Sequence, residues 1–526
     1  MDTNEKGAHI GLQTGQLPVL RDWYLESHKI AGSGLAPRRL GVIHIFFFTV
    51  AASAPLTMLG GGVTTTFAVT GVLGVPLSFI LVGLALAFFA VGYAAMSRFV
   101  SNAGAFYTYV AQGLGHATGV SAAFVALLAY NAIQIGLYGL FGAAFGDFIA
   151  SKGGPDLPWW VWGFAGMAIV AILGVLRVDL NATVLAVLLI LEITAVALFD
   201  LGAFIHPADG TITLAGLRPG DLFGGTGFQN IGIVIAFGVA AFTGFESAAI
   251  YSEECKDPRH TVGRATFAAV TFISLFYALS AWALTIGTGP SMVAEQSRQN
   301  GPGVVFGLFG QYWGNLVADV ANVLFFTSVY AALLSFHNGV ARYLFALGRE
   351  RVLPAFLGRT AAGSRAPVAG SLLQTLLAII VVGAFVIGGG NPVLQLFTWL
   401  STLAAAGIVL LMAASSMAVL GFFHRRPRDA SIWQRLVAPI LATITLSAMF
   451  GLIVWNFDTL TGSEGGLAYL RWLLPGLVIA AAVIGLIWGL VLRISNRSTY
   501  DRIGLGALAP IEELAVVSTG GIDGTH

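Results

Sequence analysis

The sequence predicts an all-α polytopic membrane protein with twelve transmembrane helices, and three observations support this fold class. Of its 526 residues, 57% are hydrophobic and only 10% are charged, whereas a soluble protein carries about 25% charged residues. Apolar runs of the roughly 20 residues that a helix needs to cross a bilayer recur along the chain. The basic residues fall mainly in every second loop. The lipid bilayer is therefore the first partner that the sequence implies.

The expected elements follow from the apolar runs. We expect a cytoplasmic N-terminal extension at 1–39, which lacks the layout of a cleaved signal peptide, and a cytoplasmic C-terminal tail at 494–526. Between them, the twelve spans are expected near 40–68, 72–95, 119–148, 158–176, 181–205, 229–253, 263–288, 312–347, 368–387, 392–422, 436–456 and 470–493.

The distribution of Lys and Arg sets the expected orientation, because cytoplasmic loops of membrane proteins are enriched in both. With the N-terminus inside, the outer loops receive only four of the 26 basic residues, Lys152, Arg218, Arg298 and Arg471. A missed or additional helix would move every later loop to the other side and blur this separation. We therefore expect a plasma membrane protein with both termini in the cytoplasm.

Composition and motifs exclude several classes of function. A net charge of +1 gives no sign of a nucleic-acid partner. The single cysteine, Cys255, excludes an internal disulfide and a cysteine metal cluster. No HExxH, GxSxG or Walker sequence occurs, and the nine histidines show no metal-ligand spacing. We expect no enzyme activity, no cofactor and no metal, and nothing resembles the selectivity-filter loop of a channel.

Two of the expected spans contain helix-breaking residues at mid-depth. The first carries Pro55 and the glycines 60–62, and the sixth carries Gly238 and Gly244 shortly before Glu246. A break in a spanning helix is costly unless it lines a cavity, although a single Gly or Pro often does no more than kink a helix. Because the two breaks lie five helices apart, they favour an inverted-repeat transporter with its site at the midplane.

Four stretches resemble the amino acid-polyamine-organocation (APC) superfamily. Phe-Thr-Gly-Phe-Glu at 242–246, followed by Glu253, Glu254 and Asp-Pro-Arg at 257–259, is similar to its sixth-helix signature. The stretch 101–115 is similar to its loop between helices 2 and 3. Ser-Phe-His-Asn at 335–338, with Arg342 and the turn at 348–354, is similar to the end of its helix 8. The resemblance covers residues 38–495 by helix order and is specific to the superfamily rather than to one substrate.

The resemblance implies a leucine-transporter-type fold that works by alternating access. The first inverted repeat would be 40–205 and the second 229–422, with broken helices 1 and 6, and two extra helices would follow at 436–493. One departure concerns helix 1, where members commonly carry a Gly-Ser/Ala-Gly-Ile type of break. Here Pro55 removes one amide donor from the loop that would hold a substrate carboxylate, which favours amines over amino acids.

The two breaks supply the expected main-chain site. A half-helix that begins at a break offers free N–H groups and the positive end of its dipole to an anionic group. Unwinding of the sixth helix frees carbonyl oxygens for a substrate ammonium. The expected anion-binding residues are Ser53, Ala54, Leu56 and Thr57, and the carbonyls expected to accept hydrogen bonds from the ammonium are those of Ala240, Ala241 and Thr243.

Helices 3 and 8 are expected to select the side chain of the solute. Tyr130, Gln134 and Tyr138 share one helical face at i, i+4 and i+8. Their alternative interpretation is interfacial aromatic residues plus one hydrogen bond between helices. Tyr130 aligns with a substrate-facing tyrosine of the superfamily, and Phe336 falls where the superfamily places an aromatic gate, although apolar packing also explains Phe336.

Ionisable residues at membrane depth are candidates for coupling. Glu192 and Glu246 are costly to bury, by at least about 2.5 kcal/mol each if charged. Many proton-coupled relatives place a lysine where Glu192 aligns, so Glu192 is expected to bind the coupling proton, with a permanently protonated structural role as the alternative. Glu246 is the second proton-coupling candidate, as a pH-sensitive latch or as an architectural residue of the motif.

A dense charge run follows the sixth span. Glu253 and Glu254 are expected to form an inner gate with Arg342, and a solvated loop is the alternative. Thr327 and Ser328 keep sodium open as the coupling ion. We expect a proton-coupled symporter of an amino acid or related amine, with a substrate-product antiporter and a non-transporting receptor as the competing functions.

Overall fold

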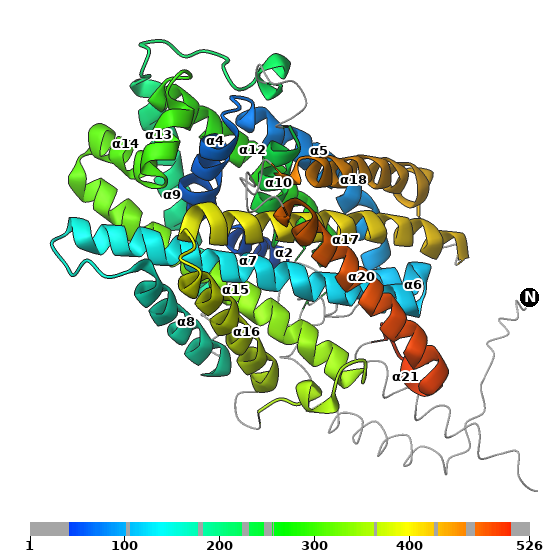
Figure 1. Cartoon of the computed structure of the whole chain (residues 1–526). Helices are drawn as coiled ribbons and strands as arrows, with labels where there is room; N and C mark the ends of the chain where they lie inside the picture. The colour runs from blue at the N-terminus through cyan, green and yellow to red at the C-terminus, as the bar shows by residue number, and fades with distance from the viewer. Residues whose placement is uncertain are drawn as a thin grey trace, which may run out of the picture. The chain divides into compact units, whose positions relative to one another are not determined.

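The computed structural model describes residues 41–100, 106–176, 182–223, 231–246, 255, 257–361, 366–425, 430–458 and 469–505. The regular elements of these residues are helices (Figure 1). Eleven helical segments in the described residues are long and apolar enough to cross a membrane. Ile231–Phe242, within the expected sixth span, is a shorter apolar helix. The all-helical membrane architecture is therefore observed, whereas the count of twelve spans and the repeat boundaries remain predictions.

The helix bounds lie close to those expected, except around the sixth span and before the eighth. The expected span 312–347 begins as a separate helix, α14, and residue Gly314 divides it from α15. The described helices that form the spans and their short companions are α2 Val42–Ser53, α3 Pro55–Thr57, η2 Met58–Val63, α4 Thr64–Thr70, α5 Val75–Ser97, α6 Phe106–Leu114, α7 His116–Ser151, α8 Trp159–Leu176, α9 Ala182–Ile205, α10 Ile231–Phe242, α12 Pro258–Thr288, α13 Val293–Asn300, α14 Gly303–Trp313, α15 Asn315–Arg349, α16 Val368–Ile387, η7 Pro392–Phe397, α17 Thr398–Arg425, η8 Trp433–Val437, α18 Ala438–Trp455, α20 Leu470–Ser495 and α21 Arg497–Asp501.

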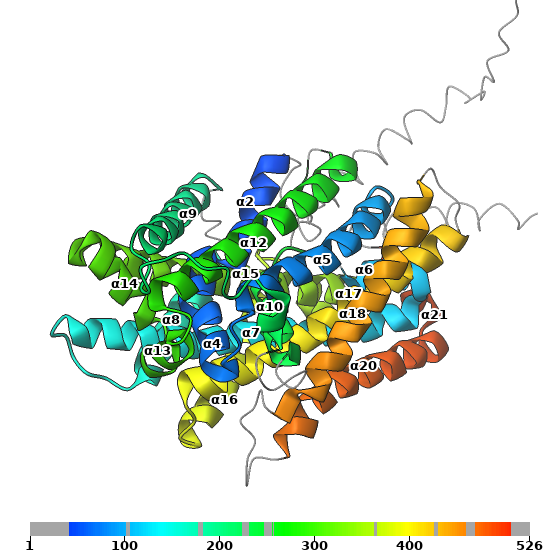
Figure 2. The same cartoon turned by 90° about the horizontal axis from the view of Figure 1, so that it is seen from above.

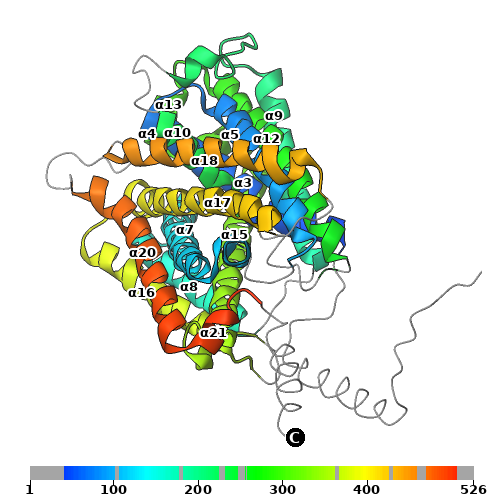
Figure 3. The same ribbon diagram turned by 90° about the vertical axis from the view of Figure 1, so that its right-hand side faces the viewer.

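The helices divide into inner and outer ones by the exposure of their aliphatic side chains. α17 is buried along most of its length and packs against α7, α18 and α6 (Figures 1 and 3). On α16, by contrast, Leu372, Leu376 and Ile380 are exposed. Exposed aliphatic surface of this extent is unfavourable in water. It is the surface expected of a helix that faces lipid.

The first span is interrupted at a single residue. α2 ends at Ser53, and Ala54 has a left-handed backbone, with φ 48° and ψ 77°. α3 then starts at Pro55, whose fixed φ suits the first position of a helix. The sequence predicted an unwound stretch from 53 to 57, whereas the structure confines the change of direction to Ala54. The glycines at 60–62 follow in the wider π-helical turn η2.

The second break ends α10 at Phe242, and a turn follows through Glu246. Gly244 has φ 110° in this turn, a conformation that other residues rarely adopt. The Gly244 amide donates to the Glu246 carboxylate at 3.0 Å. A Cβ atom on Gly244 would lie 2.8 Å from the Ala52 Cβ atom. The two breaks therefore touch, and their contact requires glycine at position 244.

α12 holds the first break from one side. It packs against α5, α2 and α9, and these helices lie together in Figure 2. The Tyr277 hydroxyl of α12 lies 3.0 Å from the Ser53 carbonyl oxygen and 2.9 Å from the Ser53 hydroxyl. These hydrogen bonds satisfy main-chain groups that the end of α2 leaves without helical partners.

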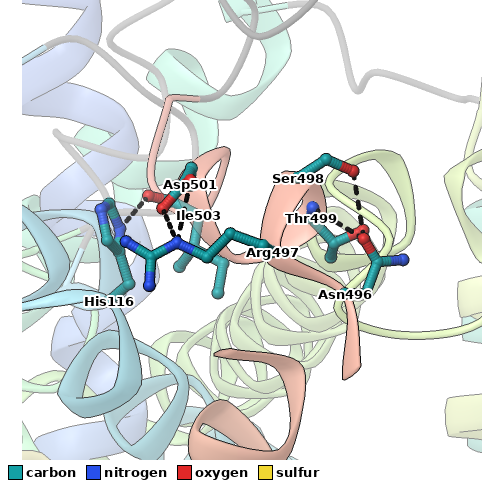
Figure 4. Close-up of polar contacts among 7 residues, drawn as sticks. All are labelled: His116, Asn496, Arg497, Ser498, Thr499, Asp501 and Ile503. Carbon is teal, nitrogen blue, oxygen red and sulfur yellow. Dashed lines mark hydrogen bonds and ion pairs between the residues drawn. The ribbon is translucent and has the colours of Figure 1, made fainter. Parts of the chain in front are cut away.

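The C-terminal segment closes against the start of α7 (Figure 4). The Asn496 side chain caps α21 by accepting the Thr499 amide at 3.1 Å. The His116 ring nitrogen Nδ1 lies 2.9 Å from the Ile503 carbonyl oxygen. The Gly504 amide donates to the buried Glu350 carboxylate at 3.0 Å. These contacts tie α21 and the residues after it to α7 and to the end of α15.

Candidate functional site

A cavity of about 50 Å³ lies where the two breaks meet. It is bounded by both interrupted helices and by faces of α7, α15 and α17. The position is the one at which a solute would contact main chain and side chains from both halves of the described structure. The lining residues are Ala52, Ser53, Ala54, Thr57, Met58, Gly62, Ile133, Leu137, Phe237, Ala240, Ala241, Thr243, Ala332, Phe336, Phe397 and Ser401.

The cavity brings together most of the main-chain site that the sequence predicted. Seven of the expected substrate-binding residues line it, from the first break, the second break and α15. Leu56 and Tyr130 are buried beside the cavity without lining it. The seven lining residues are Ser53, Ala54, Thr57, Ala240, Ala241, Thr243 and Phe336.

Gln134 and Tyr138 do not reach the cavity, and α7 presents Ile133 and Leu137 to it instead. Successive residues of a helix are rotated by about 100° around its axis. Gln134 and Tyr138, each one residue after Ile133 and Leu137, therefore face a different direction. The structure therefore leaves these two residues out of the cavity lining, and their contact with a solute stays a prediction. The alternative interpretation, in which Gln134 makes a hydrogen bond between helices, agrees with its contacts to His337 and Gln374.

Gln134 belongs to a buried polar network that joins three helices. Its side-chain amide lies 3.2 Å from the Tyr138 hydroxyl and 3.3 Å from His337 Nδ1, and its carbonyl accepts from the Gln374 amide. His337 Nε2 lies 2.6 Å from the Ser371 hydroxyl. Buried polar groups are costly unless they are satisfied in this way. The network therefore connects α7, α15 and α16 behind the cavity wall.

Tyr130 links α7 to the second break. Its hydroxyl donates to the Glu246 carboxylate at 2.5 Å, and its ring stacks on Phe336 with centroids 6.3 Å apart. Glu246 is fully buried and also accepts from the Gly244 amide. Tyr130 thus acts through Phe336 and Glu246 rather than as part of the cavity surface. Glu246 thus joins α7 to the turn after α10 through these two hydrogen bonds, and its role as a latch stays a prediction.

Most amides near the start of α3 have a hydrogen-bond partner or are absent. The Ala54 amide donates to the Val50 and Ala51 carbonyls, and Pro55 has no N–H. The Leu56 amide faces the Glu192 carboxyl. The Thr57 amide donates to the Ser328 hydroxyl at 3.3 Å, and the Met58 amide to the Ala54 carbonyl at 2.9 Å. A solute carboxylate would therefore have to displace an existing contact.

Glu192 reaches the first break from α9. Its side chain is 3% exposed, and the Ser328 hydroxyl and the Leu56 amide face its carboxyl. The Ser328 hydroxyl also accepts from the Thr57 hydroxyl at 2.9 Å. The Oε2 atom of Glu192 has no hydrogen-bond partner. The carboxyl thus lies beside the start of the helical segment that begins at Pro55.

No ionisable side chain lines the cavity among the described residues. The polar side chains of the lining are the hydroxyls of Ser53, Thr57, Thr243 and Ser401. The remaining lining is apolar, with Phe237, Phe336 and Phe397 as its aromatic members. This lining suits a small solute with an apolar body and few charged groups.

The expected inner gate is only partly in view. Arg342 lies half-buried on α15, while Glu253 and Glu254 lie outside the described residues. Their pairing with Arg342 stays a prediction. In the part of the chain that the structure describes, no group of three or more His, Cys, Asp or Glu residues is placed to hold a metal ion.

Asp200 is a buried carboxyl that sequence reasoning missed. It is 4% exposed on α9, and its Oδ2 atom lies 3.0 Å from the Ser280 hydroxyl. Its spacing from Glu192, i to i+8 on one helix, places both on nearly the same face, and this spacing was the available signal. Tyr277 and Ser401 were also missed, because only tertiary packing brings them to the two breaks.

The helices and the cavity together define a multi-pass membrane protein with a small-molecule site between two interrupted helices. The chain matches the amino acid permease family over residues 44–503. It therefore belongs to this family, within the APC superfamily, whose members are transporters rather than enzymes.

Relatives with assigned substrates cover most of the chain. A branched-chain amino acid permease of Lactococcus lactis is 26% identical over 447 residues, which are 81% of this chain and 90% of the relative. A low-affinity putrescine importer of Escherichia coli is 24% identical over 387 residues, 72% of this chain and 80% of the relative. A branched-chain amino acid permease of Bacillus subtilis is 24% identical over 477 residues, 85% and 93% of the two chains. This chain is thus a membrane transporter of amino acids or amines.

Proposed function

We propose that the protein is a secondary active symporter that carries an amino acid or related amine together with a proton by alternating access. The observation that carries this proposal is the meeting of two helix breaks at a buried cavity, with the Glu192 carboxyl at the first break. The proposal includes the layout of five plus five helices in inverted repeats, two additional helices, and both termini in the cytoplasm.

The solute is proposed to bind through its amino group. The turn after α10 ends a helix, and carbonyl oxygens at such an end accept hydrogen bonds from an ammonium. The hydroxyls of Ser53, Thr57 and Ser401 add further oxygens at the cavity wall. The apolar body of the solute would contact Ile133 and Leu137 on α7.

An amine without a carboxylate fits this cavity better than an amino acid. The amides that would hold a carboxylate are absent at Pro55, hydrogen-bonded at Thr57 and Met58, and turned toward the Glu192 carboxyl at Leu56. A solute carboxylate would also lie next to the Glu192 carboxyl. A diamine is disfavoured in turn, because no ionised side chain of the lining would pair with its second ammonium. The preferred solute is therefore a monoamine with a small apolar body.

The proton is proposed to act at Glu192. When ionised, the carboxylate is attracted to the N-terminus of α3 and holds the first turn in place. When protonated, it loses most of this attraction, and the turn is freer to move. Proton binding at one end of α3 is thereby linked to the shape of the cavity at the other, which couples the proton to the solute.

Uptake by the full-length protein in liposomes tests the proposal. Isopentylamine, leucine and putrescine are compared, since isopentylamine is leucine without its carboxylate and putrescine adds a second ammonium. An inward proton gradient should drive accumulation of isopentylamine more strongly than of the other two. Glu192→Gln should abolish accumulation driven by the gradient while counterflow exchange continues, because its side chain binds no proton.

Asp319→Asn provides the matched control, because Asp319 lies on α15 in a solvent-exposed ion pair with Lys152. It should leave proton-driven uptake unchanged. Uptake that needs preloaded solute and ignores pH would identify an antiporter. Uptake driven by sodium alone would identify sodium as the coupling ion. Binding without flux of any tested solute would identify a receptor, and each of these results contradicts the proposal.

A further inference from the structure

Asp200 lies on the same helix as Glu192, eight residues further along α9. At a rise of about 1.5 Å per residue, the two Cα atoms are separated by roughly 12 Å along the helix axis. The Asp200 side chain is 4% exposed and that of Glu192 is 3% exposed. Two buried carboxyls on one face of a membrane helix are unusual, because each is costly to bury.

The hydrogen bonds around Asp200 are those of a protonated carboxyl. The Ser280 hydroxyl lies 3.0 Å from Asp200 Oδ2 and 3.0 Å from the Phe276 carbonyl oxygen. A hydroxyl has one proton to donate, so both contacts are satisfied only when Asp200 supplies a proton of its own. The other oxygen, Oδ1, is buried without a partner. An ionised carboxylate would be poorly compensated at this position.

No charged group stabilises the anion of Asp200. α9 packs against α2, α3, α12, α14 and α15, and in the described residues no charged side chain of these helices interacts with Asp200. Along the chain, the nearest titratable residues are Glu192 on α9 and His206, directly after the end of α9. From α14, the Tyr312 ring lies against Gly202. From α12, Ser280 is the hydrogen-bonding partner, and Tyr277 lies one turn before it.

Polar groups on α12 connect the surroundings of Asp200 to the first break. Tyr277 and Ser280 are three residues apart on α12, and the Tyr277 hydroxyl contacts both oxygens of Ser53. The Ser280 hydroxyl beside Asp200 and the Tyr277 hydroxyl beside Ser53 therefore lie about one turn apart on α12, between the surroundings of Asp200 and the first break.

We propose that Asp200 is a second proton-binding carboxyl, which passes its proton to Glu192 from the membrane face at which α9 ends. In this step, the proton leaves the Asp200 carboxyl and the Glu192 carboxylate takes it, so the pair keeps its total charge. Asp200 then accepts the Ser280 hydroxyl proton in a hydrogen bond until it regains a proton from water at that face. This inference rests on the proposed proton coupling at Glu192.

Infrared spectroscopy of the full-length protein tests Asp200 without any solute. The protonated carboxyl bands of the wild type are compared with those of Asp200→Asn, Glu192→Gln and the control Asp319→Asn. Asp200→Asn should remove one band near neutral pH, and Asp319→Asn should remove none. After a pH jump, the Glu192 band should respond about tenfold more slowly in Asp200→Asn, and Asp200→Glu should restore the rate.

Ser280→Ala provides a second, milder variant that removes the hydrogen-bonding hydroxyl and keeps both carboxyls. It should shift the Asp200 band and slow the response of Glu192. An unchanged spectrum in Asp200→Asn, or a Glu192 response as fast as in the wild type, would overturn the relay. Loss of solute uptake in every variant and the wild type would instead defeat the proposed transport function, while the infrared result still decides the role of Asp200.

Discussion

Gly244 is the residue on which the contact between the two breaks depends. It combines a φ of 110° with an approach of its missing Cβ atom to 2.8 Å from Ala52. Gly244→Ala should cost on the order of 1–3 kcal/mol in backbone strain alone, and the added methyl group would push the breaks apart. We expect a lower thermal unfolding temperature and a loss of uptake.

Gly383→Ala is the matched control, because a Cβ atom at this position of α16 meets nothing within 4 Å. This substitution should leave uptake intact and should not lower the unfolding temperature, since Ala is the better helix former by about 1 kcal/mol. Equal behaviour of the two alanine variants would mean that the breaks do not need to touch.

Neighbouring residues of α7 should have separable effects. Ile133→Val enlarges the cavity that Ile133 lines, and it should raise the KM for the solute with a loss of stability of only about 0.5–1.5 kcal/mol, that of one buried methyl group. Gln134→Leu leaves His337 and Gln374 with unpaired polar atoms, at about 1–3 kcal/mol for each orphaned group. It should lower the unfolding temperature with a nearly unchanged KM.

Uptake kinetics and thermal unfolding measured on both variants decide this point. A raised KM with normal stability in Gln134→Leu would restore Gln134 to the solute site. An unchanged KM in the Ile133 variant would show that α7 does not form part of the cavity wall. The sequence shows two pairs at i and i+4 on α7, Gln134 with Tyr138 and Ile133 with Leu137. It does not show which of the two pairs faces the cavity.

At the scale of elements, each break combines a local signal with a tertiary partner. Pro55 starts α3, as its fixed φ favours, and the sequence placed this break correctly to within two residues. Its partners were not predictable, because Tyr277 and Ser328 come from helices far along the chain. A short half-helix is stable at this position only because other helices satisfy its terminal groups.

The short helix α21 depends on its cap and on its contact with α7. Asn496→Ala removes the side chain that accepts the Thr499 amide, at a cost of about 1 kcal/mol. We expect faster tryptic cleavage after Arg497 and Arg502 in limited proteolysis, because the segment opens more often. Ser495→Ala, which alters an exposed hydroxyl, should not change the rate, and equal rates in the two variants would contradict the role of the cap.

At the scale of the whole molecule, the distribution of basic residues predicts the orientation. In a Cys255→Ala background, Asp156→Cys should react with a membrane-impermeant maleimide on intact cells, because its loop is expected outside. Ser495→Cys should react only after the cells are opened, since the end of α20 is expected in the cytoplasm. Both positions are exposed. Labelling of both from the outside would show that the count of spans is wrong by an odd number.

The sequence by itself determined the membrane class, the approximate bounds of the long helices, the superfamily and the position of both breaks. These features are local, since they depend on apolar length and on the backbone restrictions of Pro and Gly. Only the tertiary structure decided that Ile133 rather than Gln134 faces the cavity, that the Glu192 carboxyl of α9 lies beside the start of α3, and that Asp200 is buried. Those outcomes depend on how each helix is rotated about its axis against its neighbours. Because nearly every face of a membrane helix is hydrophobic, the sequence gives little indication of which face is turned inward.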